Sequence, residues 1–294
     1  MLLPKFNFHE PATLAEACQI MAEYGTKAKV IAGGTDLMVN MKRKLVSPEQ
    51  LVSIGRIEEL KKFDSTSNVL RLGSCFTVAD IEASELIGKK WSALCAAAGA
   101  LGSPLIRNLA TIGGNLASAR PAADLPPPLM AYGARVVLKK KSGERVVSMD
   151  NFFLGGALTE IAPNEILSEI QIDAPPPYSG ASYINLSSRS ACDCNLVNIA
   201  SFIALDGPGG TIKSARIVMG CVGPTHMRAP SAEKLLIGEK PTEAIFAKAA
   251  EAAMKDSSPR GFAESRASAE YKKDMVRVLT NRTLSTAYKE AMMQ

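Results

Sequence analysis

Apolar residues near the start of the chain follow first a helical and then a strand-like period. Residues 13–25 place one apolar face on a helix: Leu14, Ala17, Cys18 and Met21. Thr13 and Glu16 form the sequence of a capping box at its start, and Gly25 is a typical stop. The run AKVI at 28–31 predicts a strand that leads into a Gly-Gly stretch. The chain is therefore expected to begin with a helix, a strand and a glycine-rich loop.

The pattern of apolar and polar residues predicts further helices and strands up to residue 173. It predicts strands at LVSI and VLRLGS, helices at 77–87 and 91–100, two strands joined by Ser142-Gly143 within 129–149, and a strand at 164–173. The segment APPPYSG at 174–180 then stops regular structure, because proline has no N–H donor and a fixed φ. We expect a domain boundary there.

Beyond this boundary the pattern predicts a small sheet followed by helices. NLVNIASFIALD and TIKSARIVMGCVG read as a β-hairpin around the glycine-rich turn at 207–210, and helical patterns follow at about 229–238, 242–256 and 270–290. No repeat with a period of 20–50 residues is evident. The mixture of helices and strands predicts an α+β protein.

Composition narrows the class of protein. The 294 residues, 47% of them apolar, suffice for two modest domains or one large one. No segment is long and apolar enough to span a bilayer, and the first residues lack the features of a signal peptide, so we expect a cytoplasmic protein. The net charge of +5 lies in short runs such as Lys42-Arg43-Lys44, without interleaved aromatic residues. No nucleic-acid partner is predicted.

Few side chains suit metal binding or hydrolysis. Six scattered cysteines without a C-x-x-C motif predict packing residues rather than a metal site. Only two histidines are present, and neither H-E-x-x-H nor G-x-S-x-G occurs. We therefore predict no catalytic side chain and no metal ligand, and expect any chemistry to belong to a cofactor.

Two Gly-Gly stretches are the strongest candidates for a binding site. AGGTDL (32–37) and TIGGN (111–115) each follow an apolar run, and glycine permits positive φ and close approach of another group. Successive N–H groups in such loops can bind phosphate, and two loops could hold a pyrophosphate between them. The Walker and Rossmann fingerprints are both absent. The alternative is that each pair only forms a tight turn between strands.

Residues after the second stretch strengthen the ligand hypothesis. Asn115 can both donate and accept hydrogen bonds, and Asp124 can accept them from ribose hydroxyls or an adenine amine. Pro121 and Pro126-Pro127-Pro128 stiffen the segment, which reduces the entropy lost on binding.

These motifs together resemble a known family. AGGTDL, RNLATIGGNLASARPAADLPPPLMAYGA (107–134) and several later stretches, including SRSACDCNLVNIA (188–200), are similar to the FAD-binding medium subunits of the molybdenum hydroxylases, the family of carbon monoxide and xanthine dehydrogenases. The resemblance covers essentially the whole chain. It implies a two-subdomain FAD-binding fold of the vanillyl-alcohol-oxidase/PCMH type at 1–177, with subdomains at about 1–55 and 56–177, and a small α+β C-terminal domain at 178–294.

The resemblance also implies which residues contact FAD. Backbone amides of the two loops are expected to hold the pyrophosphate: Val30, Ile31, Ala32, Gly33, Gly34, Thr35, Asp36 and Leu37 in the first, and Thr111, Ile112, Gly113, Gly114 and Asn115 in the second. Asp124 is expected at the adenosine or ribitol region, with Leu101 and Leu167 packing on the cofactor and Ser103 in the same segment. Asn185 is expected near the flavin, where many relatives have a lysine, which affects the expected flavin potential and acceptor. Arg120 also departs from the family pattern, either pairing with a phosphate or facing solvent.

The implied function is electron transfer within a complex. In such complexes a large subunit carries the molybdenum cofactor, a small subunit carries two [2Fe-2S] clusters, and FAD on the medium subunit passes electrons to NAD, a quinone or another acceptor. A dimer of heterotrimers is the expected assembly. Two alternatives stay open: a self-sufficient FAD-dependent oxidase or dehydrogenase of the same superfamily, and a binding or assembly protein whose loops are only structural.

Overall fold

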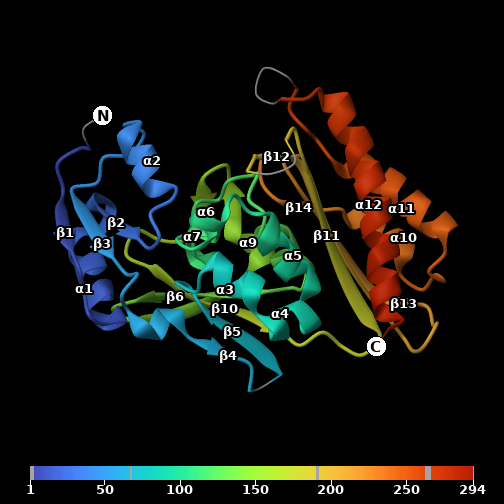
Figure 1. Cartoon of the computed structure of the whole chain (residues 1–294), viewed down its shortest axis with the longest axis horizontal. Helices are drawn as coiled ribbons and strands as arrows, with labels where there is room; N and C mark the ends of the chain where they lie inside the picture. Colours follow the sequence, from blue (N-terminus) through green and yellow to red (C-terminus); the bar gives the residue numbers. More distant parts are fainter. Residues whose placement is uncertain (1–2, 67, 190–191, 262–265, 294) are drawn as a thin grey trace. The chain divides into compact units, whose positions relative to one another are not determined.

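A computed structural model describes residues 3–66, 68–189, 192–261 and 266–293 (Figure 1). The chain divides into two compact units. Unit 1 holds residues 1–80, 104–119 and 134–173, and unit 2 holds 81–103, 120–133 and 174–294. The chain therefore passes from one unit to the other five times, after residues 80, 103, 119, 133 and 173. The boundary near residue 177 concerns sequence domains and stays a prediction.

Unit 1 contains three small sheets and several short helices. Its elements are β1 (Asn7–His9), α1 (Leu14–Tyr24), η1 (Gly25–Lys27), β2 (Ala28–Ile31), α2 (Leu37–Lys42), β3 (Gln50–Ser53), η2 (Glu58–Lys61), β4 (Phe63–Asp64), β5 (Val69–Gly73), α6 (Pro104–Arg107), α7 (Ile112–Ala117), β6 (Arg135–Lys140), β7 (Gly143–Ser148), α9 (Met149–Phe152), β8 (Phe153–Gly155), β9 (Leu158–Thr159) and β10 (Ile166–Asp173). Helix α3 (Val78–Ala83) leads out of this unit.

Unit 2 contains one larger sheet and longer helices. Its elements are α4 (Glu85–Lys90), α5 (Ser92–Ala100), α8 (Pro126–Ala131), β11 (Ser179–Ser187), β12 (Asn195–Leu205), β13 (Ile212–Gly220), β14 (Met227–Arg228), α10 (Pro230–Leu236), α11 (Glu243–Asp256) and α12 (Ala269–Ala291). The mixed helix and strand content confirms the predicted α+β class.

The N-terminal part of unit 1 is a parallel three-stranded sheet, in the order β1-β3-β2, covered by α1. The predicted face of α1 is buried against Val52 and Ile54. Thr13 Oγ1 accepts a hydrogen bond from the Glu16 N–H at 3.2 Å, as a capping box requires, but the Glu16 carboxylate reaches the N–H of Ala12 at 2.8 Å rather than that of Thr13. The predicted helix and strand are confirmed.

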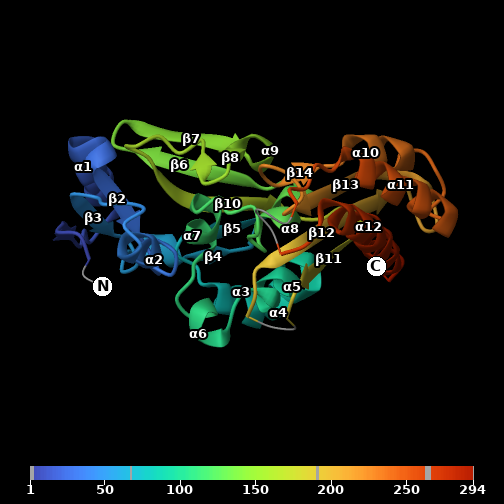
Figure 2. The ribbon, with the colours of Figure 1, turned by 90° about the horizontal axis from the view of Figure 1, so that it is seen from above.

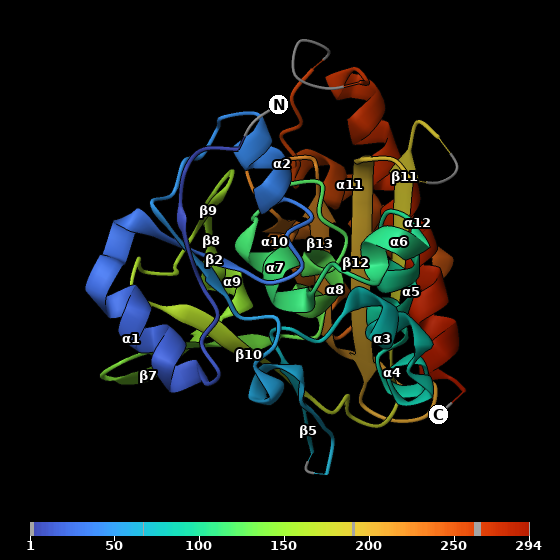
Figure 3. The same cartoon turned by 60° about the vertical axis from the view of Figure 1, so that its left-hand side comes forward.

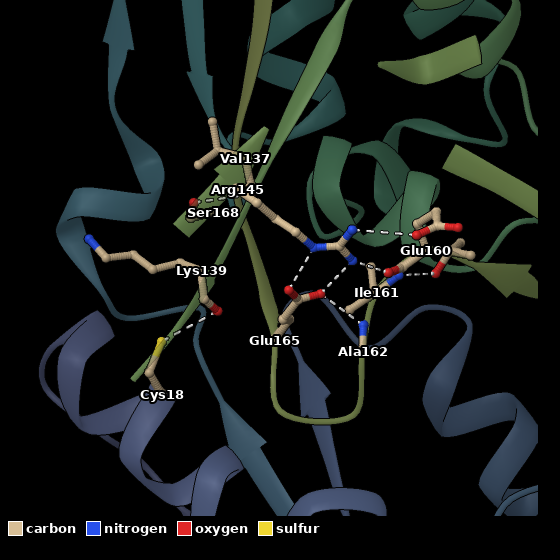
Figure 4. Close-up of polar contacts among 10 residues, drawn as sticks. Cys18, Val137, Lys139, Arg145, Glu160, Ile161, Ala162, Glu165 and Ser168 are labelled. Atoms are coloured by element: carbon tan, nitrogen blue, oxygen red, sulfur yellow. Dashed lines mark hydrogen bonds and ion pairs between the residues drawn. The ribbon is translucent and has the colours of Figure 1, made fainter. Parts of the chain in front are cut away.

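The rest of unit 1 is built on an antiparallel sheet in the order β4-β5-β10-β6-β7 (Figure 2). Edge strand β7 is fixed by Arg145, whose Nε and Nη2 donate to the two carboxylate oxygens of Glu165 at 2.8 and 2.9 Å (Figure 4). The same guanidinium contacts the carbonyl and the carboxylate of Glu160, and Glu165 also accepts from the N–H of Ala162 at 2.9 Å. This cluster holds the loop before β10 in place.

Unit 2 is built around β12, whose eleven residues are all buried. The sheet order is β11-β12-β13-β14. Residues such as Ile199 and Ile203 pack with helices α10, α11 and α12, while alternate residues face the other way: Phe202 contacts Tyr132 and Asn198 bonds to the Ala123 carbonyl. A strand that is covered on both faces has a continuous apolar sequence, which made β12 predictable. The predicted hairpin of β12 and β13 is confirmed, since the two strands pair antiparallel.

Three predicted elements differ in detail. The helix expected at 77–87 is two helices, since Ser84 interrupts it and caps α4 by accepting from the Ile87 N–H at 3.3 Å. Residues 129–131 belong to α8 rather than to a strand. The second Gly-Gly stretch does not follow a strand but forms the first turn of helix α7.

Candidate functional site

The first Gly-Gly loop connects the end of β2 to the start of α2. Gly34 has a φ of 72°, a left-handed conformation that favours glycine, and its carbonyl accepts from the Met38 N–H at 3.0 Å. Within the described part of the chain, no group accepts a hydrogen bond from the N–H groups of Gly33, Gly34 or Thr35. Three successive amide donors without protein acceptors can bind an anion such as phosphate.

The second Gly-Gly stretch uses its amides differently. Thr111 caps α7 and its Oγ1 accepts from the N–H of Gly114 at 3.0 Å. The N–H groups of Ile112, Gly113 and Asn115 donate to the carbonyls of Phe76, Ser74 and Thr111 at 2.9 to 3.0 Å. All four amides therefore have protein acceptors, and their predicted role in holding pyrophosphate stays a prediction.

The two stretches meet within unit 1, where α2 lies near α7 (Figure 3). The hydroxyl of Ser118, just after α7, donates to Asp36 Oδ2 at 2.8 Å. A Cβ atom on Gly33 would lie 1.6 Å from the Leu109 carbonyl oxygen, so the backbone before α7 fits only against a glycine. On Gly113, a Cβ atom would lie 2.5 Å from that of Ser74. Both glycines thus allow close packing of the backbone.

One buried acceptor beside these loops lacks a protein partner. The Oδ1 atom of Asn115 is buried without a hydrogen bond from the described residues. Leaving such an acceptor unpaired costs about 1–3 kcal/mol, and a bound hydroxyl group would remove that cost. Ser74 Oγ is a second buried polar atom of this kind. An FAD molecule offers both phosphate oxygens for free amides and hydroxyl donors for free acceptors, so the residues present fit this cofactor.

The other predicted contacts in unit 1 are mainly packing positions. Val30 and Ile31 lie in β2 opposite Val52 and Ser53, and Leu37 begins α2. Ala32 is half-buried against the core below α1. Leu167 is only 6% exposed in β10, opposite Leu138. Their contact with the cofactor stays a prediction.

Asp124 lies in unit 2 at the centre of a buried polar network. Its Oδ1 accepts from the Tyr183 hydroxyl and from Asn195 Nδ2, each at 2.7 Å. Burial raises the pKa of the Asp124 carboxyl, and the two hydrogen bonds oppose that shift. The pKa of Tyr183 is also raised well above its usual range, by burial and then by the neighbouring carboxylate. The structure thus gives Asp124 a structural role in unit 2; its predicted contact with the cofactor stays a prediction.

The same network extends through Ala123. The carbonyl of Ala123 accepts from Asn198 Nδ2 at 3.0 Å and lies 3.3 Å from His226 Nε2. Burial lowers the pKa of His226 to about 4, so the ring is neutral near pH 7. Both interactions fix the backbone just before Asp124.

Three further predicted residues belong to unit 2. Leu101 is 8% exposed at the end of α5, Ser103 is half-buried two residues later, and Asn185 Nδ2 donates to Asn195 Oδ1 at 2.9 Å. The motif at 188–200 includes residues 190–191, which lie outside the described residues. The expected roles of these residues toward the flavin stay predictions.

The described residues offer neither a metal site nor a membrane-spanning helix. They contain no group of three or more histidine, cysteine, aspartate or glutamate side chains that could hold a metal ion. Among the helices of the described ranges, none is long and apolar enough to cross a membrane.

Comparison with known proteins identifies the family. Residues 4–175 match the family described as the FAD binding domain in molybdopterin dehydrogenase, and 182–287 match the CO dehydrogenase flavoprotein C-terminal domain. The chain is an FAD-binding medium subunit of the molybdenum hydroxylase family. The resemblance predicted from the sequence is confirmed. This medium subunit is accordingly an oxidoreductase component with FAD as its cofactor.

Relatives match the medium subunit over nearly its whole length. It is 30% identical to the carbon monoxide dehydrogenase medium chain of Hydrogenophaga pseudoflava, covering 98% of this chain and 99% of the relative. It is 28% identical to the putative xanthine dehydrogenase FAD-binding subunit of Escherichia coli (strain K12), covering 96% and 95%.

Solved structures agree with the fold. A chain of carbon monoxide dehydrogenase from Hydrogenophaga pseudoflava superposes with a TM-score of 0.93 at 31% identity, covering 99% of each chain. Quinoline 2-oxidoreductase from Pseudomonas putida 86 gives a TM-score of 0.91 at 27% identity, covering 99% of this chain and 100% of the other. The predicted two-part architecture of an FAD-binding domain and a C-terminal domain is confirmed.

Two structural residues of the site were not predicted. Ser118 links α7 to Asp36, and the Leu109 carbonyl packs on Gly33. Both lie inside the stretch at 107–134, but a serine or a carbonyl at these positions carries no sequence signal of its partner. Only the fold brings residues 33 and 109 together.

Proposed function

We propose that the medium subunit holds the pyrophosphate of FAD on its first Gly-Gly loop. The support is the set of N–H groups of Gly33, Gly34 and Thr35, which lack acceptors among the described residues. Amide donors in a turned loop suit phosphate oxygens, because they place partial positive charge without a charged side chain. Asp36 positions the loop through its hydrogen bond from Ser118.

The second segment contributes through Asn115. Its four amides have protein acceptors, but the buried Oδ1 of Asn115 has none among the described residues. A ribitol or ribose hydroxyl would satisfy this atom. The orphaned Oδ1 is therefore the observation that carries the assignment to a ligand with hydroxyl groups, rather than to free phosphate.

The subunit serves electron transfer within a complex. When bound, FAD supplies the redox chemistry, accepting electrons and releasing them to a further acceptor. Neither histidine is arranged as a general base: His226 is buried against the Ala123 carbonyl, and His9 bonds to the Gln50 side chain at 2.8 Å. The chain's own residues need only bind and orient the cofactor.

The proposed partners follow from the relatives, which are described as medium chains or subunits. We propose a large subunit with a molybdenum cofactor and a small subunit with two [2Fe-2S] clusters, assembled as a dimer of heterotrimers. Electrons would pass from the small subunit to FAD and then to NAD, a quinone or another carrier.

The experiment that tests cofactor binding is the visible spectrum of the purified chain, with the released chromophore separated into FAD and FMN. Bound FAD, with a weaker affinity for FAD in the Asn115→Leu variant, supports the proposed site. An unchanged affinity for FAD in that variant would exclude the role of Asn115. A subunit that stays free of FAD even when purified with its partners would contradict the whole proposal.

Electron transfer is tested separately by adding substrate panels to the chain alone and to the complex. The electron-transfer role predicts flavin reduction only in the complex. Reduction of the isolated chain by a substrate would instead support a self-sufficient dehydrogenase.

A further inference from the structure

Two of the six cysteines differ from the others in exposure. Cys18 and Cys75 are buried, Cys95 and Cys221 are half-buried, and Cys192 and Cys194 are exposed. Burial also raises the pKa of Cys75 to about 11 and that of Cys221 to about 12, which disfavours their reactive thiolate forms. A soluble oxidant would therefore reach the thiols of Cys192 and Cys194 first.

The side chain of Asp193, the residue between these two cysteines, is buried where they are exposed. The Asp193 side chain is only 1% exposed and accepts hydrogen bonds from Arg189 and Arg266. Its Oδ1 also accepts from the Cys194 N–H at 2.9 Å. Asp193 is thus held by hydrogen bonds, while the residues on either side of it, Cys192 and Cys194, are exposed.

The spacing permits a bond between the two sulfurs. The Cα atoms of residues i and i+2 lie at most about 7 Å apart, and disulfides join residues whose Cα atoms are roughly 4.4–6.8 Å apart. Cys192 has a φ of 54°, so the backbone turns at this position rather than continuing extended. The spacing of the two cysteines and the turn at Cys192 are compatible with a bridge between them.

The reduced form has contacts that a bridge would change. Cys192 Sγ donates to the Gly102 carbonyl at 3.4 Å, and closing the bridge would break this contact. Cys194 directly precedes Asn195, whose Nδ2 donates to Asp124 Oδ1 at 2.7 Å. All of these residues belong to unit 2. A disulfide between Cys192 and Cys194 would therefore lie next to Asn195, which belongs to the buried hydrogen-bond network of Asp124.

We propose that Cys192 and Cys194 form a reversible dithiol that hydrogen peroxide converts to an intramolecular disulfide. One sulfur attacks a peroxide oxygen, so that an S–O bond forms, the O–O bond breaks and one water leaves. The second sulfur then attacks the resulting sulfenic sulfur, the S–S bond forms and the S–O bond breaks with release of a second water. The two thiols lose two electrons and two protons, and the peroxide is reduced to two waters. This site is independent of the electron-transfer role.

The test treats the purified, FAD-loaded full-length chain with hydrogen peroxide and follows intact mass and thiol titration. The parent is expected to lose two hydrogen atoms in mass and two titratable thiols, with the bridge mapped to Cys192 and Cys194 and removed by dithiothreitol. Cys192→Ser and Cys194→Ser are expected to gain oxygen instead. Cys95→Ser, the matched control, is expected to form the bridge as the parent does.

Several results would overturn the proposal. They are a bridge that maps to other cysteines, a covalent dimer, and a Cys192→Ser or Cys194→Ser variant that loses two hydrogens like the parent. Since both side chains are exposed, these serine variants are expected to fold normally, which circular dichroism checks. Gain of oxygen by the parent without loss of two hydrogens would also contradict the inference.

Discussion

The Leu109 carbonyl oxygen lies 1.6 Å from the position that a Cβ atom on Gly33 would occupy. Two segments 76 residues apart in sequence (109 minus 33) therefore touch through their backbones. The glycine is needed there because no side chain fits, and this close approach places the first loop beside the segment leading into α7. Gly34, with its positive φ, supplies the turn itself.

Replacing Gly33 with alanine is expected to reduce both stability and FAD content. The added methyl group would displace the Leu109 backbone, and overpacking of this kind costs about 1–3 kcal/mol. Urea unfolding of the apo-protein and the FAD-to-protein ratio measure the two effects. Gly55→Ala is the matched control, since its Cβ would lie 3.7 Å from the Ala32 carbonyl, an ordinary contact. Unchanged stability of Gly33→Ala would contradict the packing role.

Replacing Asn115 with leucine is expected to separate binding from stability. The buried Oδ1 of Asn115 has no protein partner among the described residues, so its removal should leave the stability of the apo-protein unchanged or raise it. Affinity for FAD should fall roughly tenfold or more, the equivalent of one hydrogen bond. Fluorescence titration of the apo-protein with FAD measures this change.

Thr111→Ala provides the contrasting variant. It removes the acceptor for the Gly114 N–H and the cap of α7, which is expected to cost about 1 kcal/mol in the apo-protein. If Asn115→Leu destabilised the apo-protein as much as Thr111→Ala, then Oδ1 would have a structural partner and the ligand assignment would fail.

The sequence predicted the helices and strands well where one face or both faces of an element are apolar. Helix α1 and strand β12 follow directly from such patterns. The prediction of a loop at the Gly-Gly pair 113–114 is wrong: although glycine has a low helix propensity, the Thr111 cap and the packing of Gly113 on Ser74 stabilise a helix there. The network around Asp124 was not predictable, since Tyr183 and Asn195 come from the paired strands β11 and β12 while Asp124 reaches them from the loop before α8.

Acid is expected to destabilise the subunit through His226. Its pKa is about 4 in the folded state and 6.5 when unfolded, so the unfolded state binds more protons between these values. The contribution to stability is complete above pH 6.5 and is lost as pH falls toward 4, by about 3 kcal/mol in total. His226→Gln should show a shallower decline over this window in urea unfolding.

His9→Gln is the control for that experiment, because it removes the other histidine. Asp124, whose raised pKa makes stability fall as pH rises, titrates in all these proteins, so it cancels in the comparison. The same pH dependence in His226→Gln and the parent would show that His226 is not the group responsible.

Replacing Arg145 with methionine is expected to lower the stability at pH 7. Glu165, with 3% of its side chain exposed, would lose two hydrogen bonds to the guanidinium (Figure 4). Because the Arg145 side chain is 42% exposed, solvent screens part of the effect, and a loss of about 1–3 kcal/mol is expected. Arg71→Met is the comparison: its partner Glu169 is 31% exposed, against 3% for Glu165, so losing the Arg71–Glu169 pair should cost less than about 1 kcal/mol.

The same variant should be less sensitive to acid. The Arg145 hydrogen bonds lower the pKa of Glu165, so its contribution is present above the unfolded pKa near 4.5 and is lost as pH falls through the folded value. The difference in unfolding midpoint between the parent and Arg145→Met should therefore shrink on acidification. A difference that stays constant with pH would argue against the ion pair as the cause.

The alternation of the chain between two compact units has a consequence for synthesis on the ribosome. Helix α8, whose six residues are all buried, contacts β11, β12 and β13, which are translated at least 48 residues later (residue 131 to residue 179). A nascent chain that ends near residue 177 therefore carries an apolar helix without its sheet. Such an intermediate exposes apolar surface to which chaperones bind. Splitting the gene between the two sequence domains would leave both fragments with incomplete cores.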